Sequence, residues 1–313
     1  MVKEILYTIQ SPYRQDMHIY GYRFGHSDGE KAACVIGAIR GNEVQQLYIC
    51  SQLVRQLGEL EHRGAIASGK QILVIPSVNH FSMNVGKRFW PSDNTDINRM
   101  FPGDSTGETT ERIADGLFQS VCGYTFGIQM ASFYIPGDFV PHVRMMDTGK
   151  QNLSLASQFG LPYVVVRKPK PIDTATLNYN WQLWNTSAFS IYTNKTDEID
   201  EESAEQAVSA ILRFFTRMGI LRYNCHSGYI ASVIEEENLL SIRCQTPGIF
   251  RPLVKPGQEV SVGMPVARVL DPLEGAELTQ ILSPTDGIIF FAHKDPLVME
   301  NSVIFKVIKR LHK

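Results

Sequence analysis

The sequence is poor in cysteine and lacks any paired-cysteine motif. Five cysteines are spread over 313 residues, and no two of them form a Cys-x-x-Cys pair; they are Cys34, Cys50, Cys122, Cys225 and Cys244. A disulfide-stapled fold needs an even set of cysteines, and a cysteine zinc site needs short pairs. The sequence therefore predicts reduced and mostly buried thiols.

Long apolar runs and a surplus of charge are also missing. No stretch reaches the length that spans a bilayer, and residues 1–4 lack the apolar core of a signal peptide. The formal net charge is −2, with no basic surplus for nucleic acid or an anionic membrane. We therefore expect a cytoplasmic protein that binds neither nucleic acid nor a membrane, and the sequence leaves a homo-oligomer open.

Two common catalytic signatures are absent as well. No Gly-x-x-x-x-Gly-Lys-Ser/Thr loop is present to cradle a phosphate, and no Gly-x-Ser-x-Gly elbow is present to display a nucleophilic serine. Neither phosphate-binding loops nor serine nucleophiles of these types are indicated.

Strand-like and helix-like patterns alternate over the first 220 residues. Strands are predicted near residues 20–24, 31–39, 71–76, 124–131, 163–166 and 188–192, and helices over residues 43–60, 109–121, 155–159 and 200–219. The two prolines and one glycine of residues 133–143 predict a loop there. This alternation is typical of an α/β layered fold.

From about Asn224 the pattern changes to short apolar pieces between glycine and proline turns, with no helical period. That pattern predicts a β-rich module of short strands. We therefore divide the chain into an α/β domain over residues 1–223 and a β-rich module over residues 224–313.

The stretch Val35–Glu43 joins these patterns to a candidate site. An apolar run enters a glycine turn, and Glu43 follows as a helical pattern begins. Open α/β sheets place ligands at such carboxyl ends of strands. A turn that binds a metal would place histidine where Arg40 stands, so Arg40 is the unusual residue.

Three segments together resemble one protein family. Gly41–Glu43 follows a buried strand, Asp96–Gly103 reads D-x-N-R-x-F-P-G, and Val254–Val260 lies in the β-rich module. The chain is similar in these segments to the succinylglutamate desuccinylase/aspartoacylase family, a branch of the zinc carboxypeptidase-like fold. The resemblance implies a three-layer α/β/α sandwich with a mixed sheet, followed by a lipoyl-like all-β sandwich.

Active members of that family bind one zinc ion through an H-x-x-E turn and a later histidine, and a further glutamate takes a proton from the metal-bound water. The resemblance places the turn on Arg40 and Glu43, and the later histidine position on Gln129. Counting back eight residues from Asp200 places the catalytic glutamate position at Tyr192. Two of the three ligands and the catalytic carboxylate are therefore replaced.

These replacements change the chemistry of the site. Arginine has no lone pair to offer a metal and keeps its positive charge, and a glutamine amide is a poor zinc ligand. Tyrosine does not act as a carboxylate base near neutral pH. We therefore hypothesise that the Arg40 guanidinium fills the place of the metal and pairs with Glu43, the one retained ligand.

The substrate side of the motif is retained. In the family the Asn-Arg pair anchors a substrate carboxylate, and it falls here on Asn98 and Arg99. Arg88 and Arg144 are further cations near the same loops, and we include Arg144 among the candidate substrate-binding residues. A structural salt bridge is the alternative role for each of these arginines.

A relocated metal site would need histidines near Glu43. His80 and His142 lie in segments that approach the predicted site, so Glu43, His80 and His142 form the candidate set. Unrelated loop histidines are the alternative reading.

Three functions remain open. The first is a degenerate family member that keeps a pocket for a small acidic or N-acyl-amino-acid-like ligand and needs no cofactor. The second is an active zinc-dependent deacylase or carboxypeptidase-like hydrolase with relocated ligands. The third is a non-catalytic interaction protein that uses the β-rich module. The replaced residues and the retained Asn98–Arg99 pair favour the first.

Overall fold

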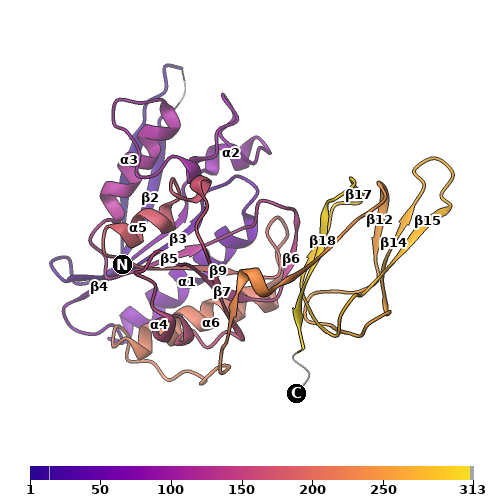
Figure 1. Cartoon of the computed structure of the whole chain (residues 1–313). Helices are drawn as coiled ribbons and strands as arrows, with labels where there is room; N and C mark the ends of the chain where they lie inside the picture. Colours follow the sequence, from indigo (N-terminus) through magenta and orange to yellow (C-terminus); the bar gives the residue numbers. More distant parts are fainter. Residues whose placement is uncertain (14, 311–313) are drawn as a thin grey trace.

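A nine-stranded mixed sheet forms the centre of the first part of the chain (Figure 1). The computed structural model describes residues 1–13 and 15–310. In spatial order the strands are β1 (Val2–Ile9), β2 (Met17–Gly25), β4 (Lys70–Ser77), β3 (Glu30–Ala38), β5 (Phe126–Met130), β9 (Ser187–Tyr192), β7 (His142–Met146), β8 (Tyr163–Arg167) and β10 (Ser232–Glu235). The central strands β4, β3, β5 and β9 run parallel to one another, so their carboxyl ends meet at one edge of the sheet.

Helices cover both faces of this sheet. One face packs against α1 (Val44–His62), α4 (Leu153–Ser157) and α6 (Glu201–Arg217), and the other packs against α3 (Thr109–Val121) and α5 (Leu177–Leu183). Short turns of helix complete this part: α2 (His80–Asn84), η1 (Ile97–Arg99), η2 (Pro171–Asp173) and η3 (Glu236–Asn238). None of the helices within residues 1–13 and 15–310 combines the length and apolarity needed to cross a membrane.

The ends of the two clearest helices follow local sequence signals. Glu108 and Glu111 form a capping box at the start of α3, so the first free amide groups are satisfied there. Asp200 accepts a hydrogen bond from the Ser203 amide at the start of α6. Beyond the end of α6, Gly219 adopts a φ of +69°, which a glycine tolerates readily.

The second part of the chain is a sandwich of two sheets around its own apolar core (Figure 1). One sheet contains β11 (Leu240–Arg243), β18 (Val303–Lys309), β16 (Gly287–His293) and β13 (Glu259–Val260). The other contains β15 (Glu277–Leu282), β14 (Pro265–Leu270), β12 (Gly248–Pro252) and β17 (Leu297–Val298). The predicted three-layer α/β domain with a β-rich C-terminal module is confirmed.

The prediction of a loop over residues 133–143 is wrong. The segment contains β6 (Gly137–Phe139) and the first residues of β7. Strand β6 pairs with β16 in the C-terminal module, through Phe139 opposite Phe291. The prolines on either side of β6 indicate a loop. The strand forms only because it pairs with β16, about 150 residues further along the chain, which no local pattern can predict.

Two connections join the parts of the molecule. Strand β6 leaves the α/β part to join the module, and β10 extends the nine-stranded sheet immediately before β11 begins. The proposed division at residue 223 stays a prediction, and β10 lies on the module side of that division.

Candidate functional site

The turn between β3 and α1 carries the centre of the candidate site. The carbonyl oxygen of Lys87 would lie 2.1 Å from a Cβ atom at position 41, so only glycine fits there. The Gly41 amide donates to the Arg88 carbonyl at 2.8 Å. The close approach fixes the direction in which Arg40 leaves the strand.

The Arg40 guanidinium lies between two carboxylates. Its Nη2 atom is 2.8 Å from Asp96 Oδ2, its Nε atom donates to both Asp96 oxygens, and its Nη1 atom is 3.2 Å from Glu43 Oε1. The Arg40 side chain is only 6% exposed. This geometry is what the pairing hypothesis requires of Arg40 and Glu43, and it adds Asp96 as a second partner.

The carboxylate of Glu43 is saturated with donors. Its Oε2 atom accepts from the Ile39 amide at 2.8 Å and from the Arg40 amide at 2.9 Å. Its Oε1 atom accepts from the Ser132 hydroxyl and from Arg40 Nη1. Both carboxylate oxygens of Glu43 therefore accept hydrogen bonds that stabilise the turn. A metal would have to compete for these same oxygens.

Burial lowers the pKa of Arg40, but the charges on Asp96 and Glu43 outweigh burial and raise it above its usual value. The guanidinium therefore stays protonated, as arginine does in proteins generally. A charged cluster of one guanidinium and two carboxylates forms the centre of the site.

A small cavity of about 50 Å³ opens beside Arg40. Its polar lining comes from strand ends, from the loops after them and from the start of α5: Arg40, Asn98, Arg99, Gln129, Ser132, Arg167, Asp173, Thr176, Asn178, Ser190 and Tyr192. Five of the predicted site residues, Arg40, Asn98, Arg99, Gln129 and Tyr192, thus lie around one cavity.

Asn98 and Arg99 also have structural partners. Asn98 Oδ1 accepts from the Leu177 amide at 3.3 Å. Arg99 Nη1 donates to the Ile172 carbonyl at 2.6 Å and lies 3.3 Å from Asp173 Oδ1. Asp173 in turn binds Arg167 Nη2 at 2.6 Å. Arg99 therefore faces the cavity with one nitrogen already engaged.

Arg144 lies behind the cavity wall rather than in it. Its guanidinium is 4.4 Å from the centre of the Tyr192 ring and also lies over Phe133 and Phe139. All three of its side-chain nitrogens are buried and have no hydrogen-bond partner among the described residues. Of the predicted substrate-binding residues, Arg144 is the one without a counter-group in contact.

The remaining predicted residues do not form a metal site. His142 is fully buried, stacks on Tyr192 at 4.9 Å and makes a hydrogen bond with the Val140 carbonyl through Nδ1. Burial and the charge of Arg144 hold the pKa of His142 well below its usual value. Within residues 1–13 and 15–310, no three His, Cys, Asp or Glu side chains come together as a metal-binding group. Glu43, His80 and His142 are therefore not brought together.

Zinc does not fit the donor set at the family position. Arg40 brings a cation, Gln129 brings a neutral amide, and both oxygens of Glu43 already accept hydrogen bonds.

Sequence reasoning missed several residues of this site. Asp96 could have been predicted as a site residue, because it is the first residue of the D-x-N-R motif. Ser132, Asp173, Asn178 and Arg167 carried no local signal, since their roles depend on loops that meet only in the fold. Asn178 is notable because its amide donates to Ser190 Oγ at 3.0 Å while its buried Oδ1 has no partner among the described residues.

The sequence model of the succinylglutamate desuccinylase/aspartoacylase catalytic domain matches residues 30–217, more than half of the chain. The chain belongs to this family. A curated relative, the N-alpha-acetyl-L-2,4-diaminobutyric acid deacetylase of Halomonas elongata, is 26% identical over 140 residues. That match covers 43% of this chain and spans about two fifths (39%) of the length of the relative.

Solved structures of family members share the whole fold. The structure of a succinylglutamate desuccinylase from Silicibacter sp. has a TM-score of 0.81 at 17% identity and covers 97% of this chain and 92% of its own. The product-bound ectoine utilization protein EutE (DoeB) from Ruegeria pomeroyi has a TM-score of 0.76 at 18% identity and covers 93% and 89%. At these identities the likeness establishes the fold.

Proposed function

We propose that this protein is a family member that has lost zinc hydrolysis and kept a pocket for a small carboxylate. The ligand is a small acidic or N-acyl-amino-acid-like molecule, in keeping with the acylated amino acid named for the Halomonas relative. The protein binds this ligand without a cofactor.

The position of Arg40 carries the proposal. Its guanidinium lies on Glu43 and Asp96, is almost fully buried and is permanently charged. Such a group stands where the family binds a metal but cannot activate a water molecule. Because Glu43 and Asp96 offset its charge, Arg99 in the cavity lining is the cation that meets an anionic ligand.

The cavity beside Arg40 limits the ligand. About 50 Å³ is room for one or two water molecules or a carboxylate group, well below the ~300–1,000 Å³ of ordinary ligand pockets. A second cavity of about 310 Å³ shares Phe133, Tyr134 and Arg167 with the first. We infer that the carboxylate enters beside Arg40 and that the rest of a larger ligand occupies the second cavity once Phe133 and Tyr134 shift.

The alternative function is an active metal-dependent deacylase, which the family membership favours. It would require ligands outside the set that the sequence suggested, because Glu43, His80 and His142 do not meet. The two functions differ in metal content and in turnover.

The test begins with protein purified without chelator. We expect no stoichiometric zinc and no hydrolysis of N-acetyl-2,4-diaminobutyrate or of other N-acyl amino acids. About one zinc per chain, lost together with hydrolysis in Glu43→Gln, would rule out the proposal.

Ligand binding is tested by calorimetry with a panel of small mono- and dicarboxylates and N-acyl amino acids. Gln129→Leu is the sharpest variant, because the buried Gln129 side chain lines the cavity and leucine has a similar volume without the amide. We expect it to weaken binding at little cost in stability, and we expect Arg99→Ala to weaken binding as well. Arg55→Ala, on the exposed face of α1, is the control. If no carboxylate binds, the pocket is a relic.

A further inference from the structure

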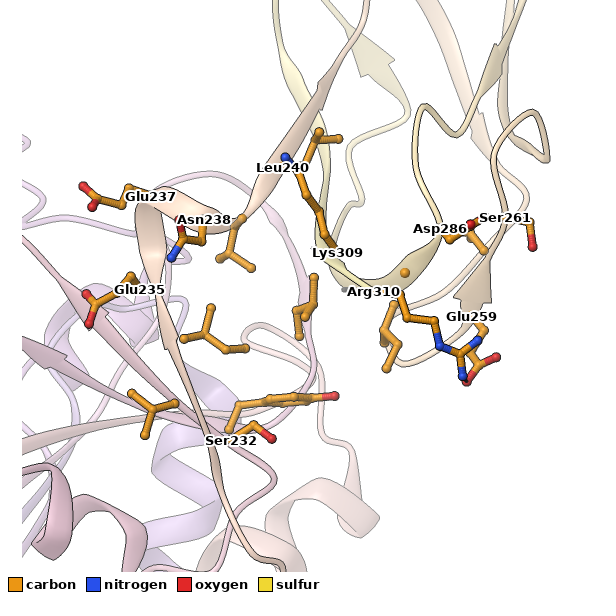
Figure 2. A pocket seen from close by; sticks show the side chains of 18 residues that line it. Ser232, Glu235, Glu237, Asn238, Leu240, Glu259, Ser261, Asp286, Lys309 and Arg310 are labelled. Atoms are coloured by element: carbon orange, nitrogen blue, oxygen red, sulfur yellow. Dashed lines mark ion pairs between the residues drawn. The ribbon is translucent and has the colours of Figure 1, made fainter. Parts of the chain in front are cut away.

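A groove much larger than either of these cavities lies between the α/β part and the module, away from the Arg40 site. Its volume is about 1310 Å³. Strand β10 and Tyr163 form one side, and the ends of β13, β16 and β18 form the other. Figure 2 shows β10, with Ser232 and Glu235, standing across the groove from Glu259, Ser261 and Arg310.

Strand β10 offers an open edge to this groove. It is the last strand of the nine-stranded sheet and pairs only with β8, in parallel. The Ser232 amide donates to the Pro162 carbonyl, so in a parallel ladder Ser232 and Ile234 face β8 while Val233 and Glu235 turn their backbone groups outward. In this register the Val233 and Glu235 amides point away from β8, towards the open edge.

Strand β10 has no proline and no bulge on this edge. Natural edge strands are protected from further pairing by short length, charged side chains, proline or a bulge, and β10 is short and has one charged side chain, that of Glu235. The strand reads Ser-Val-Ile-Glu, its register with β8 is regular, and Val233 is 48% exposed. Apolar side chains of Leu239 and Ile308 continue the groove beyond it.

We propose that the groove binds an extended peptide segment of a partner protein, which adds a strand to β10. This inference goes beyond the carboxylate pocket and does not depend on it. Backbone hydrogen bonds to Val233 and Glu235 would hold the segment, and alternate apolar side chains would enter the groove.

The surroundings of β10 favour a single strand over a second copy of the chain. Within each copy the module stands across the groove from β10 (Figure 2). An extended segment brings only its own width into the groove, whereas the β10 strand of another copy would bring its module with it.

The charge of the lining indicates a basic segment. Four acidic side chains, those of Glu235, Glu237, Glu259 and Asp286, line the groove with two basic ones, those of Lys309 and Arg310. Glu259 lies 3.9 Å from Arg310, and Glu237 lies 3.1 Å from Lys168. Glu235 is exposed and has no ion pair among the described residues, so it can meet a lysine or arginine of the segment.

The test pans a phage-displayed library of random dodecapeptides against the immobilised full-length protein and against its Val233→Pro variant. Proline removes the outward amide and leaves the bonds to β8 in place, so its fold is expected to survive. Peptides that enrich on the natural protein are synthesised with a fluorescein label and measured by fluorescence polarisation.

We expect peptides that alternate apolar residues with lysine or arginine. Their binding is lost in Val233→Pro and kept in Val233→Thr, the matched control that retains the amide. Glu235→Lys weakens binding by up to about fivefold, the range of an exposed ion pair, while Glu300→Lys does not. Hydrogen exchange of the natural protein should show the Val233 and Glu235 amides slowed by the peptide, a readout that needs no variant.

Other results overturn the proposal. It is wrong if no peptide enriches above the Val233→Pro background, or if enriched peptides bind that variant equally well. It is also wrong if light scattering finds a dimer that Val233→Pro dissociates, because the edge would then pair with a second copy.

Discussion

Arg40 sets the chemistry of the site at the scale of single residues. A metal ion at this position would be held by lone pairs, whereas Arg40 is held by ion pairs with two carboxylates. We expect Arg40→Met, which keeps the volume and removes the charge, to lower the free energy of unfolding by about 3–5 kcal/mol. Urea denaturation followed by far-UV circular dichroism measures this loss.

The matched control is Arg55→Met. Arg55 also binds a glutamate, Glu59, at 2.9 Å, but both side chains are more than half exposed. We expect that variant to stay within about 0.5 kcal/mol of the natural protein. Similar small losses in both variants would show that the buried pairs of Arg40 contribute no more than a surface ion pair.

The lowered pKa of Glu236 makes the free energy of unfolding depend on pH. Burial pushes the pKa of Glu236 up, but the charges of Arg144, Lys306 and Arg167 outweigh burial and lower it from 4.5 to about 2. The folded state therefore favours ionised Glu236, and its contribution is complete above pH 4.5 and is lost as the pH falls towards 2. The shift corresponds to roughly 3 kcal/mol.

The test compares the natural protein with Glu236→Gln from pH 6 to pH 2. We expect the difference in unfolding free energy to be largest at pH 6 and to shrink steadily below pH 4.5. Glu237→Gln is the control on the same turn, since the Glu237 side chain is 63% exposed and pairs with Lys168 at the surface. A difference between natural protein and Glu236→Gln that does not change with pH would contradict the assignment.

The sequence predicts only those site residues that belong to short motifs. Arg40, Glu43 and Asn98 could be placed because each belongs to a short run with a known geometry. Arg144 could be named but not located, because its burial behind Tyr192 depends on the pairing of β7 with β9. Ser132 and Asp173 act through contacts between segments far apart in the chain, which no local pattern records.

At the scale of helices and strands, the elements with local sequence signals were again predicted, and those that depend on distant contacts were not. The predicted helix over residues 109–121 coincides with α3, whose capping signal and apolar face lie in its own sequence. Strands β1 and β10 and helix α5 were not predicted. Each is short or at an edge of the sheet, and its conformation depends on neighbours rather than on periodicity.

Gly137 gives a test of the β6 connection. A Cβ atom at this position would lie 2.3 Å from the Phe291 ring and 2.5 Å from the Ala292 carbonyl oxygen. Because a backbone atom cannot move aside, we expect Gly137→Ala to destabilise the protein by about 1–3 kcal/mol. Gly58→Ala is the control, since nothing surrounds Gly58 in α1 and alanine should stabilise that helix by up to about 1 kcal/mol. Equal urea midpoints for the two variants would mean that β6 does not bind the module closely.

At the scale of the whole molecule, one apolar cluster joins the two parts. Phe133, Phe139 and Val165 from the α/β part pack with Phe290 and Phe291 from the module. Lys306 of the module binds Glu236 of η3, in the segment that links β10 to the module, at 2.9 Å. Phe133 also lines the cavity beside Arg40, so the module supports the wall of the candidate site.

This shared core predicts that the two parts unfold together. All three tryptophans lie in the α/β part, so their fluorescence reports on that part alone, whereas far-UV circular dichroism reports on both. We expect both signals to give the same urea midpoint, because neither part can keep the shared cluster buried without the other. In Phe290→Ala, which truncates the cluster, both midpoints should fall together, with a loss of about 3–5 kcal/mol. Two separate transitions in the natural protein would show that the module folds independently, and the wall of the carboxylate pocket would then not depend on it.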